Sequence, residues 1–135
     1  MRHRVVLVRE RDARAAGSGC CGGFDGLRDE PVAPGAHARI RVDMEAMGAV
    51  YRALRDRWSA DEVEIVVVEP RNMVWLVPAV WRDARRRGGT RRQAWRQVLG
   101  VAHNTVIVDG EVVFTATPPH PAEAVAVVGA ALAGQ

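Results

Sequence analysis

The sequence predicts a single α/β domain in which four strands form a mixed sheet flanked by helices on both faces. Three observations support this prediction: an apolar run near the N-terminus, a second apolar run after a helical segment, and a strong β-hairpin signal in the last third. A chain of 135 residues is long enough to bury a core of its own. The expected order is strand, long loop, helix, strand, two helices, two strands and a last helix.

The first half has the pattern of a parallel β–α–β unit. Residues 4–9 predict a buried first strand, and the almost wholly apolar residues 63–68 predict a second strand that is buried on both faces. Between them, apolar residues recur at helical spacing over residues 44–58. Asp43, directly before this series, is the N-cap that we expect for the helix.

The second half predicts two helices, a hairpin and a last helix. One helix follows Asn72, and Pro78 either kinks it or marks its start. Thr90 caps a shorter helix over residues 91–99.

The hairpin is the strongest local signal in the chain. The dipeptide Asp109-Gly110 separates two short β-prone runs, residues 105–108 and 111–114, as in a two-residue β-turn. The last helix is expected over residues 121–132, after a proline-rich link.

The two cysteines of the chain, Cys20 and Cys21, are adjacent in a glycine-rich stretch. They fall in a long loop expected at about 11–42, within which residues 38–42 alternate and predict a short extended stretch. Loops of this length in compact domains are often functional. A disulfide between neighbouring cysteines is strained and easily reduced, so this pair suits a redox switch better than a structural link.

The chain lacks a signal-like segment and an apolar run long enough to span a bilayer, so we expect a cytoplasmic protein. In that compartment a cysteine pair favours redox, catalytic or metal chemistry over a structural disulfide. The alternative is that one cysteine packs as a small hydrophobic residue and the other is incidental.

Three segments together resemble a divergent thioredoxin-like protein and are most similar to the small YuzD-like disulfide oxidoreductases: Val5–Val8 leading to the cysteines, Val63–Val68, and Thr105–Val113. The resemblance implies a thioredoxin-like fold, a β–α–β half followed by a β-hairpin and a helix. It also implies that Cys20 is the nucleophile and Cys21 the resolving thiol.

The same resemblance implies that His103 and Asn104, just before the third strand, border the thiol site and bind substrate together with Phe24. The sequence departs from the family pattern at two points. The usual Cys-x-x-Cys is absent, and the place of the family's cis-proline is taken by Asn104 or His103.

The sequence therefore predicts a thiol–disulfide redox or thiol-sensing protein that acts on a protein thiol or a small thiol and needs no cofactor. A second hypothesis is a non-catalytic thioredoxin-like interaction module that can form a homodimer through Trp75 and Trp81. A third is a soft-metal binding protein that uses the two thiolates.

The basic excess consists of arginine alone, and the net charge of +3 is modest. The densest cluster, residues 82–96, has the composition that attracts nucleic acid or an acidic protein. The usual explanation of such a run is a solvated helix face. We therefore expect no nucleic-acid partner, and the lack of a long apolar run predicts no membrane partner.

Overall fold

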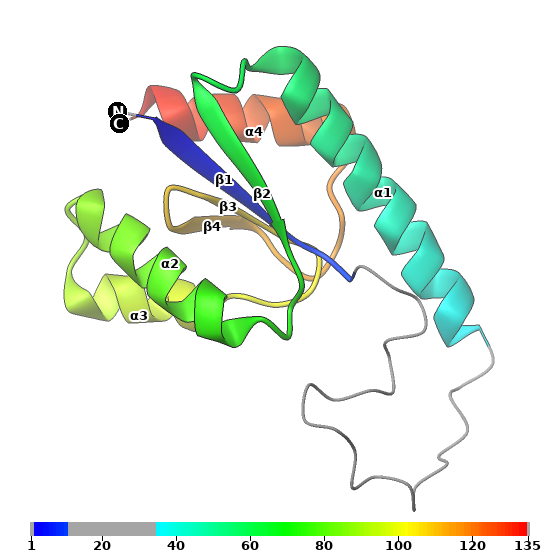
Figure 1. The fold of residues 1–135 in the computed structure, drawn as a ribbon, viewed down its shortest axis with the longest axis horizontal. Coiled ribbons are helices and arrows are strands. Elements are labelled where there is room, and N and C mark those ends of the chain that lie inside the picture. The colour runs from blue at the N-terminus through cyan, green and yellow to red at the C-terminus, as the bar shows by residue number, and fades with distance from the viewer. Residues whose placement is uncertain (1, 11–34, 135) are drawn as a thin grey trace, which may run out of the picture.

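The sheet has four strands in the order β2-β1-β3-β4, in a computed structural model that describes residues 2–10 and 35–134 (Figure 1). The strands are β1 (His3–Val8), β2 (Val63–Val68), β3 (Thr105–Val108) and β4 (Glu111–Phe114). β1 and β2 are parallel, whereas β3 is antiparallel to both of its neighbours. The predicted four-stranded mixed sheet and the predicted order of elements are confirmed.

Helices cover both faces of this sheet (Figure 1). They are α1 (Ala36–Arg57), α2 (Met73–Arg86), α3 (Arg91–Leu99) and α4 (Pro121–Ala133). α1 and α4 pack together on one face, and α2 and α3 pack together on the other. No helix in the described part of the chain combines the length and the apolar character needed to cross a membrane.

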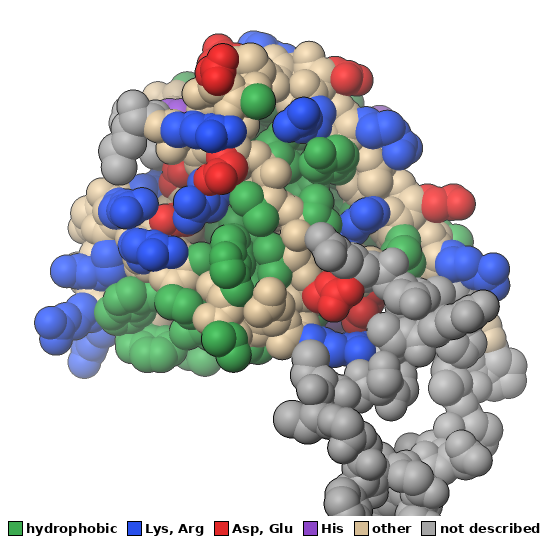
Figure 2. Space-filling view, viewed as in Figure 1, with side chains coloured by type: hydrophobic (Ala, Val, Ile, Leu, Met, Phe, Trp, Pro, Cys, Tyr) green, Lys and Arg blue, Asp and Glu red, His purple; other side chains and the backbone are tan. Residues whose placement is uncertain are grey.

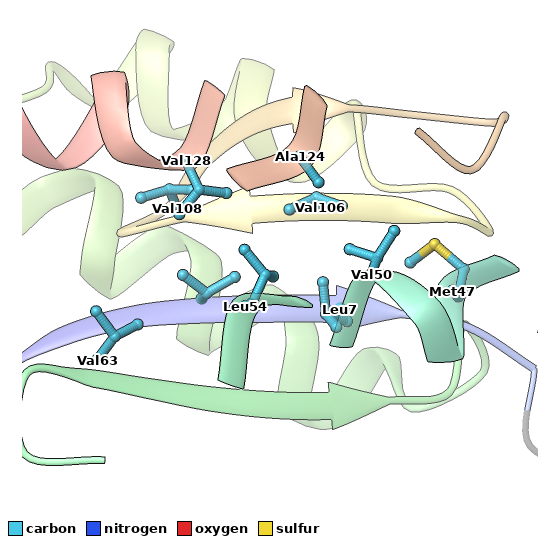
Figure 3. Packing of buried hydrophobic residues seen from close by; sticks show 10 residues of the cluster. Leu7, Met47, Val50, Leu54, Val63, Val106, Val108, Ala124 and Val128 are labelled. Carbon is cyan, nitrogen blue, oxygen red and sulfur yellow. The ribbon is translucent and has the colours of Figure 1, made fainter. Parts of the chain in front are cut away.

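β1 is one of the two inner strands of the sheet, and its residues 5–8 are buried. Its side chains alternate, as in any strand. Val5 and Leu7 enter the core beneath α1 and α4, while Val6 and Val8 enter the core beneath α2 and α3. Figure 3 shows the first of these cores, in which Leu7 lies beside Val50 of α1. Burial on both sides explains why the strand is an unbroken apolar run.

α1 begins earlier than the sequence predicted. Its N-cap is Gly35, with a φ of 95°, so Asp43 lies inside the helix and its prediction as the N-cap is wrong. Residues 38–42 are helical and not extended, and the loop predicted at about 11–42 ends by Gly35. The physical reason is that Ile40 extends the apolar series one turn upstream of Met44, in a stretch rich in good helix formers.

The other helix signals hold with small differences. α2 contains Pro78 as an internal residue, and the side chain of its N-cap, Asn72, makes no capping hydrogen bond. Thr90 does cap α3: its hydroxyl accepts from the Gln93 N–H, and the Gln93 side chain accepts from the Thr90 N–H. This reciprocal capping box satisfies two of the free amides at the helix start.

The Asp109-Gly110 turn packs directly against α2. Both residues have positive φ, 45° and 81°, as a two-residue hairpin turn of the primed type requires. A Cβ added to Gly110 would lie 2.2 Å from the backbone nitrogen of Ala84. Glycine is therefore required here twice over, by the backbone angle and by the helix behind it.

Arg4 connects this turn to the rest of the sheet. Its backbone N–H donates to Asp109 Oδ1 at 2.7 Å, and its guanidinium donates to Glu64 at 2.9 Å and to Asp83 at 3.1 Å. The hydrogen bond to Glu64 is the main cause that raises the pKa of Arg4 above its ordinary value. His3 Nδ1 lies 2.8 Å from the other oxygen of Asp109.

Gly110→Ala should destabilise the protein far more than Gly88→Ala. Gly88 also has a positive φ, 83°, but nothing lies within 4 Å of an added Cβ. Alanine at a left-handed position costs about 1 kcal/mol, and the clash at Gly110 should add about 2 kcal/mol more. Urea unfolding of the two variants measures the difference. Equal losses in the free energy of unfolding would show that an added Cβ at Gly110 does not clash with α2.

Arg4→Gln should lower the free energy of unfolding by about 2 kcal/mol, because it leaves the buried Asp83 carboxylate without its closest cation. Arg2→Gln, which removes an exposed charge two residues away, is the matched control and should change stability by less than about 0.5 kcal/mol. Similar losses in urea unfolding would contradict a specific role for Arg4.

Candidate functional site

A hollow of about 180 Å³ lies at the end of β1, between the first half of α1 and the turn that precedes β3. Three parts of the chain that are distant in sequence meet there. Its lining consists of Glu10, Arg39, Ile40, Asp43, Met44, His103 and Asn104. Both predicted site residues of the described part of the chain, His103 and Asn104, contribute to this lining.

The structure brings together His103 and Asn104, which were predicted to border the thiol site. Glu10, also in the lining, is the last described residue before the segment that contains the cysteines. Cys20, Cys21 and Phe24 lie outside the described residues. The hollow is therefore linked to the cysteine pair by chain connectivity.

Asn104 is the most constrained residue of the site. It is buried and has a φ of 53°, a left-handed conformation that asparagine tolerates better than most residues. Its side-chain amide donates to Asp43 Oδ2 at 3.0 Å and to the Ala116 carbonyl at 3.3 Å. Asn104 thus ties α1 to the turn before β3 and fixes the Asp43 carboxylate at the hollow.

Thr105 closes the same turn from the other side. Its buried hydroxyl accepts from the Ala102 N–H at 3.1 Å and donates to the Ala102 carbonyl at 2.8 Å. His103, between these anchored residues, remains exposed. The turn is therefore a rigid support that presents one imidazole to solvent at the rim of the hollow.

The remaining lining residues give the hollow mixed polarity. Arg39 supplies a cation, Ile40 and Met44 supply apolar surface, and Glu10 lies 3.8 Å from Arg71 in an ion pair. Such a lining can hold a small polar group next to an apolar one.

Sequence reasoning missed the contribution of Arg9. Its guanidinium donates from Nη1 to the Met44 carbonyl at 3.1 Å, so it lies between the end of β1 and α1. Its Nε is buried and has no hydrogen-bond partner among the described residues. Charged residues that follow an apolar strand were the available signal, but their position against α1 depends on a contact between segments far apart in sequence.

The two tryptophans predicted at a homodimer contact are both half-buried. Trp75 packs on the core beneath α2 and lines a second hollow, beside β2. Trp81 lies against Trp95, with ring centroids 5.1 Å apart. The most exposed apolar side chains of the helices on this face are others, Val74 and Leu99.

No family model, curated protein or solved structure matches this chain. Within residues 2–10 and 35–134, no three His, Cys, Asp or Glu side chains are grouped as a metal site would need. The turn before β3 contains no proline and is formed by the left-handed Asn104, and the described residues contain no cis peptide bond.

Asn104→Ala should destabilise the protein by about 2 kcal/mol, because it removes two hydrogen bonds and places alanine in the left-handed region. Asn104→Gly is the matched variant: it loses the same hydrogen bonds but keeps the backbone angle, so about half of the loss should remain. Urea unfolding separates the two contributions. A wild-type midpoint for both variants would contradict the anchoring role of Asn104.

Proposed function

We propose that this chain is a thioredoxin-like protein that carries out thiol–disulfide exchange or thiol sensing with Cys20 and Cys21. The observation that carries the proposal is the hollow at the end of β1, immediately before the segment that holds the cysteine pair. Thiol chemistry requires a place where a substrate disulfide can rest against the protein while a thiolate attacks it.

The sheet supports the thioredoxin-like part of the proposal. A β–α–β half with parallel strands is followed by a β-hairpin and a last helix, and helices lie on both faces. This is the arrangement that the family resemblance implies. The missing Cys-x-x-Cys spacing makes the vicinal pair a variant of the family's chemistry.

The proposed reaction has two steps. The Cys20 thiolate attacks one sulfur of a substrate disulfide, so that a Cys20–substrate disulfide forms and the other substrate sulfur leaves as a thiolate that takes up a proton. The Cys21 thiolate then attacks the Cys20 sulfur, so that a Cys20–Cys21 disulfide forms and the second substrate sulfur leaves as a thiolate that takes up a proton. Two electrons have passed to the substrate, and an external dithiol reductant restores the pair.

The residues of the hollow would serve this chemistry electrostatically. A cation beside a cysteine favours the thiolate and lowers the pKa of the thiol. Arg39 is the cation in the lining, and the imidazole of His103 lies in the same lining. Asn104 acts as a positioning residue through Asp43 and the turn.

The proposal is tested by alkylation of single-cysteine variants across pH. Cys21→Ser should leave Cys20 with a pKa below the ordinary thiol value of about 8.5, and with a small disulfide it should accumulate a mixed disulfide that mass spectrometry detects. Cys20→Ser should form none. Arg39→Gln should raise the pKa of Cys20. Arg41→Gln, an exposed position on the same helix outside the lining, should not.

Two slowly labelled thiols with pKa values at or above about 8.5 would overturn the redox proposal. Equal pKa values of Cys20 in the Arg39→Gln and Arg41→Gln variants would be compatible with the thiol chemistry. They would show that the hollow takes no part in it. The two results are distinct, so the site and the chemistry are tested separately.

A further inference from the structure

We infer that the outer face of the α2–α3 hairpin docks this protein on an anionic phospholipid surface. The inference is independent of the thiol chemistry, because the face lies on the opposite side of the sheet from α1, which lines the hollow. Two properties of the face support it: an exposed apolar end and an adjoining basic end.

The apolar end contains most of the exposed large hydrophobic residues in the described part of the chain. There are five such residues, and four of them are on the hairpin: Met73, Val74, Trp95 and Leu99, exposed by 43%, 90%, 51% and 81%. α2 and α3 run side by side in opposite directions, so the start of α2 lies near the end of α3 (Figure 1). Figure 2 shows apolar side chains on the part of the surface where these two helices lie in Figure 1.

The basic end lies where α2 stops and α3 starts. Residues 73–99 contain seven arginines and a single acidic residue, Asp83, although the whole chain has a net charge of only +3. Asp83 is buried and bonded to Arg4, and it also lies 3.8 Å from Arg86. Glu111 pairs with Arg87, so acidic side chains offset two of the seven arginines. Figure 2 shows basic side chains gathered at this end of the molecule.

On α3 the two properties share one stripe. Arg92, Trp95, Arg96 and Leu99 follow the i, i+3, i+4, i+7 spacing that places residues on one helix face, and all four are exposed. Trp95 is held against Trp81 of α2. The contact holds the tryptophan in place on a stripe that also presents two arginines and ends in a leucine.

A phospholipid surface fits this combination better than the other partners do. Aliphatic groups such as Val74 and Leu99 can enter the acyl boundary, tryptophan favours the interface, and arginine pairs with phosphate. A helical protein partner needs a groove. The hollow on the α2–α3 hairpin beside Gly110 and the hollow beside β2 are lined by other residues than Val74, Trp95 and Leu99.

Two other kinds of partner, nucleic acid and a second copy of this chain, are compatible with only one of the two properties of the face. Nucleic acid would use the arginines through its phosphates, but it gives no role to aliphatic side chains as exposed as Val74 and Leu99. A second copy docked face to face would bring two arginine-rich ends together, where Glu111, already paired with Arg87, is the nearby carboxylate. The proposed contact is peripheral, so the absence of a membrane-spanning run in the sequence does not oppose it.

Flotation of the full chain with vesicles tests the inference. We expect binding to vesicles of equal parts phosphatidylglycerol and phosphatidylcholine, little binding to phosphatidylcholine alone, and a blue shift of tryptophan emission that Trp95→Phe reduces. Arg92→Gln combined with Arg96→Gln should weaken binding about 25-fold, about fivefold for each charge lost at an anionic surface. Val74→Ser combined with Leu99→Ser should weaken it about tenfold.

Matched controls come from α1. Val42 is the fifth exposed hydrophobic residue, at 63%, so Val42→Ser removes a similar group from another face. Arg41→Gln combined with Arg55→Gln removes two exposed charges there. These variants should bind as the wild type does. Equal weakening by the α1 and α3 variants would overturn the inference, because net charge alone would then explain the binding.

Three other results would also overturn it: no binding to anionic vesicles, equal binding to neutral vesicles, or tighter binding to a single-stranded oligonucleotide that Val74→Ser and Leu99→Ser leave unchanged. Circular dichroism and urea unfolding of each variant show that the fold is intact. The substituted residues are exposed, so no variant should lose its fold.

Discussion

Arg4 fixes the register of β1 against both of its neighbours, β2 and β3. The positions of the other elements follow from that register. β1 and β3 are apolar on both faces, so a slip of one residue would still bury apolar side chains and the hydrophobic pattern cannot exclude it. Hydrogen bonds of polar groups therefore determine the register. Arg4 and Asp109 exchange hydrogen bonds across β1 and β3, and the Arg4 side chain reaches Glu64, its register partner on β2.

The opposite end of the sheet is fixed in a comparable way, and that end carries the candidate site. Asn104 and Thr105 anchor the turn before β3, and Asn104 also reaches α1 through Asp43. The elements that hold the hollow together are therefore the same ones that end the strand pairing. A site built on such a support keeps its shape because its lining cannot move without disturbing the sheet.

Much of the fold was predictable because its signals are local. The Asp109-Gly110 turn, the Thr90 cap and the periodicity of each helix are read from neighbouring residues, and all are present in the structure. The start of α1 was missed because an alternating stretch outweighed the apolar series that includes Ile40. His103 and Asn104 were expected at the site from the family resemblance, but Asp43 and Arg9 were not.

These two residues could not be assigned from the sequence because their roles depend on pairings over long distances. Asp43 meets a residue 61 positions away, and Arg9 contacts a helix residue 35 positions away. The same limit applies to the α2–α3 face. The arginine run was visible, but its position beside exposed Val74 and Leu99 depends on how the two helices pack.

The position of β1 between β2 and β3 also affects co-translational folding. This strand is synthesised early, yet one of its neighbours, β3, lies about a hundred residues downstream. The first half, with β2 and α1, can assemble while translation continues. Until β3 emerges, the backbone N–H and C=O groups on the β3 side of β1 have no strand partner. An open strand edge of that kind promotes association between nascent chains.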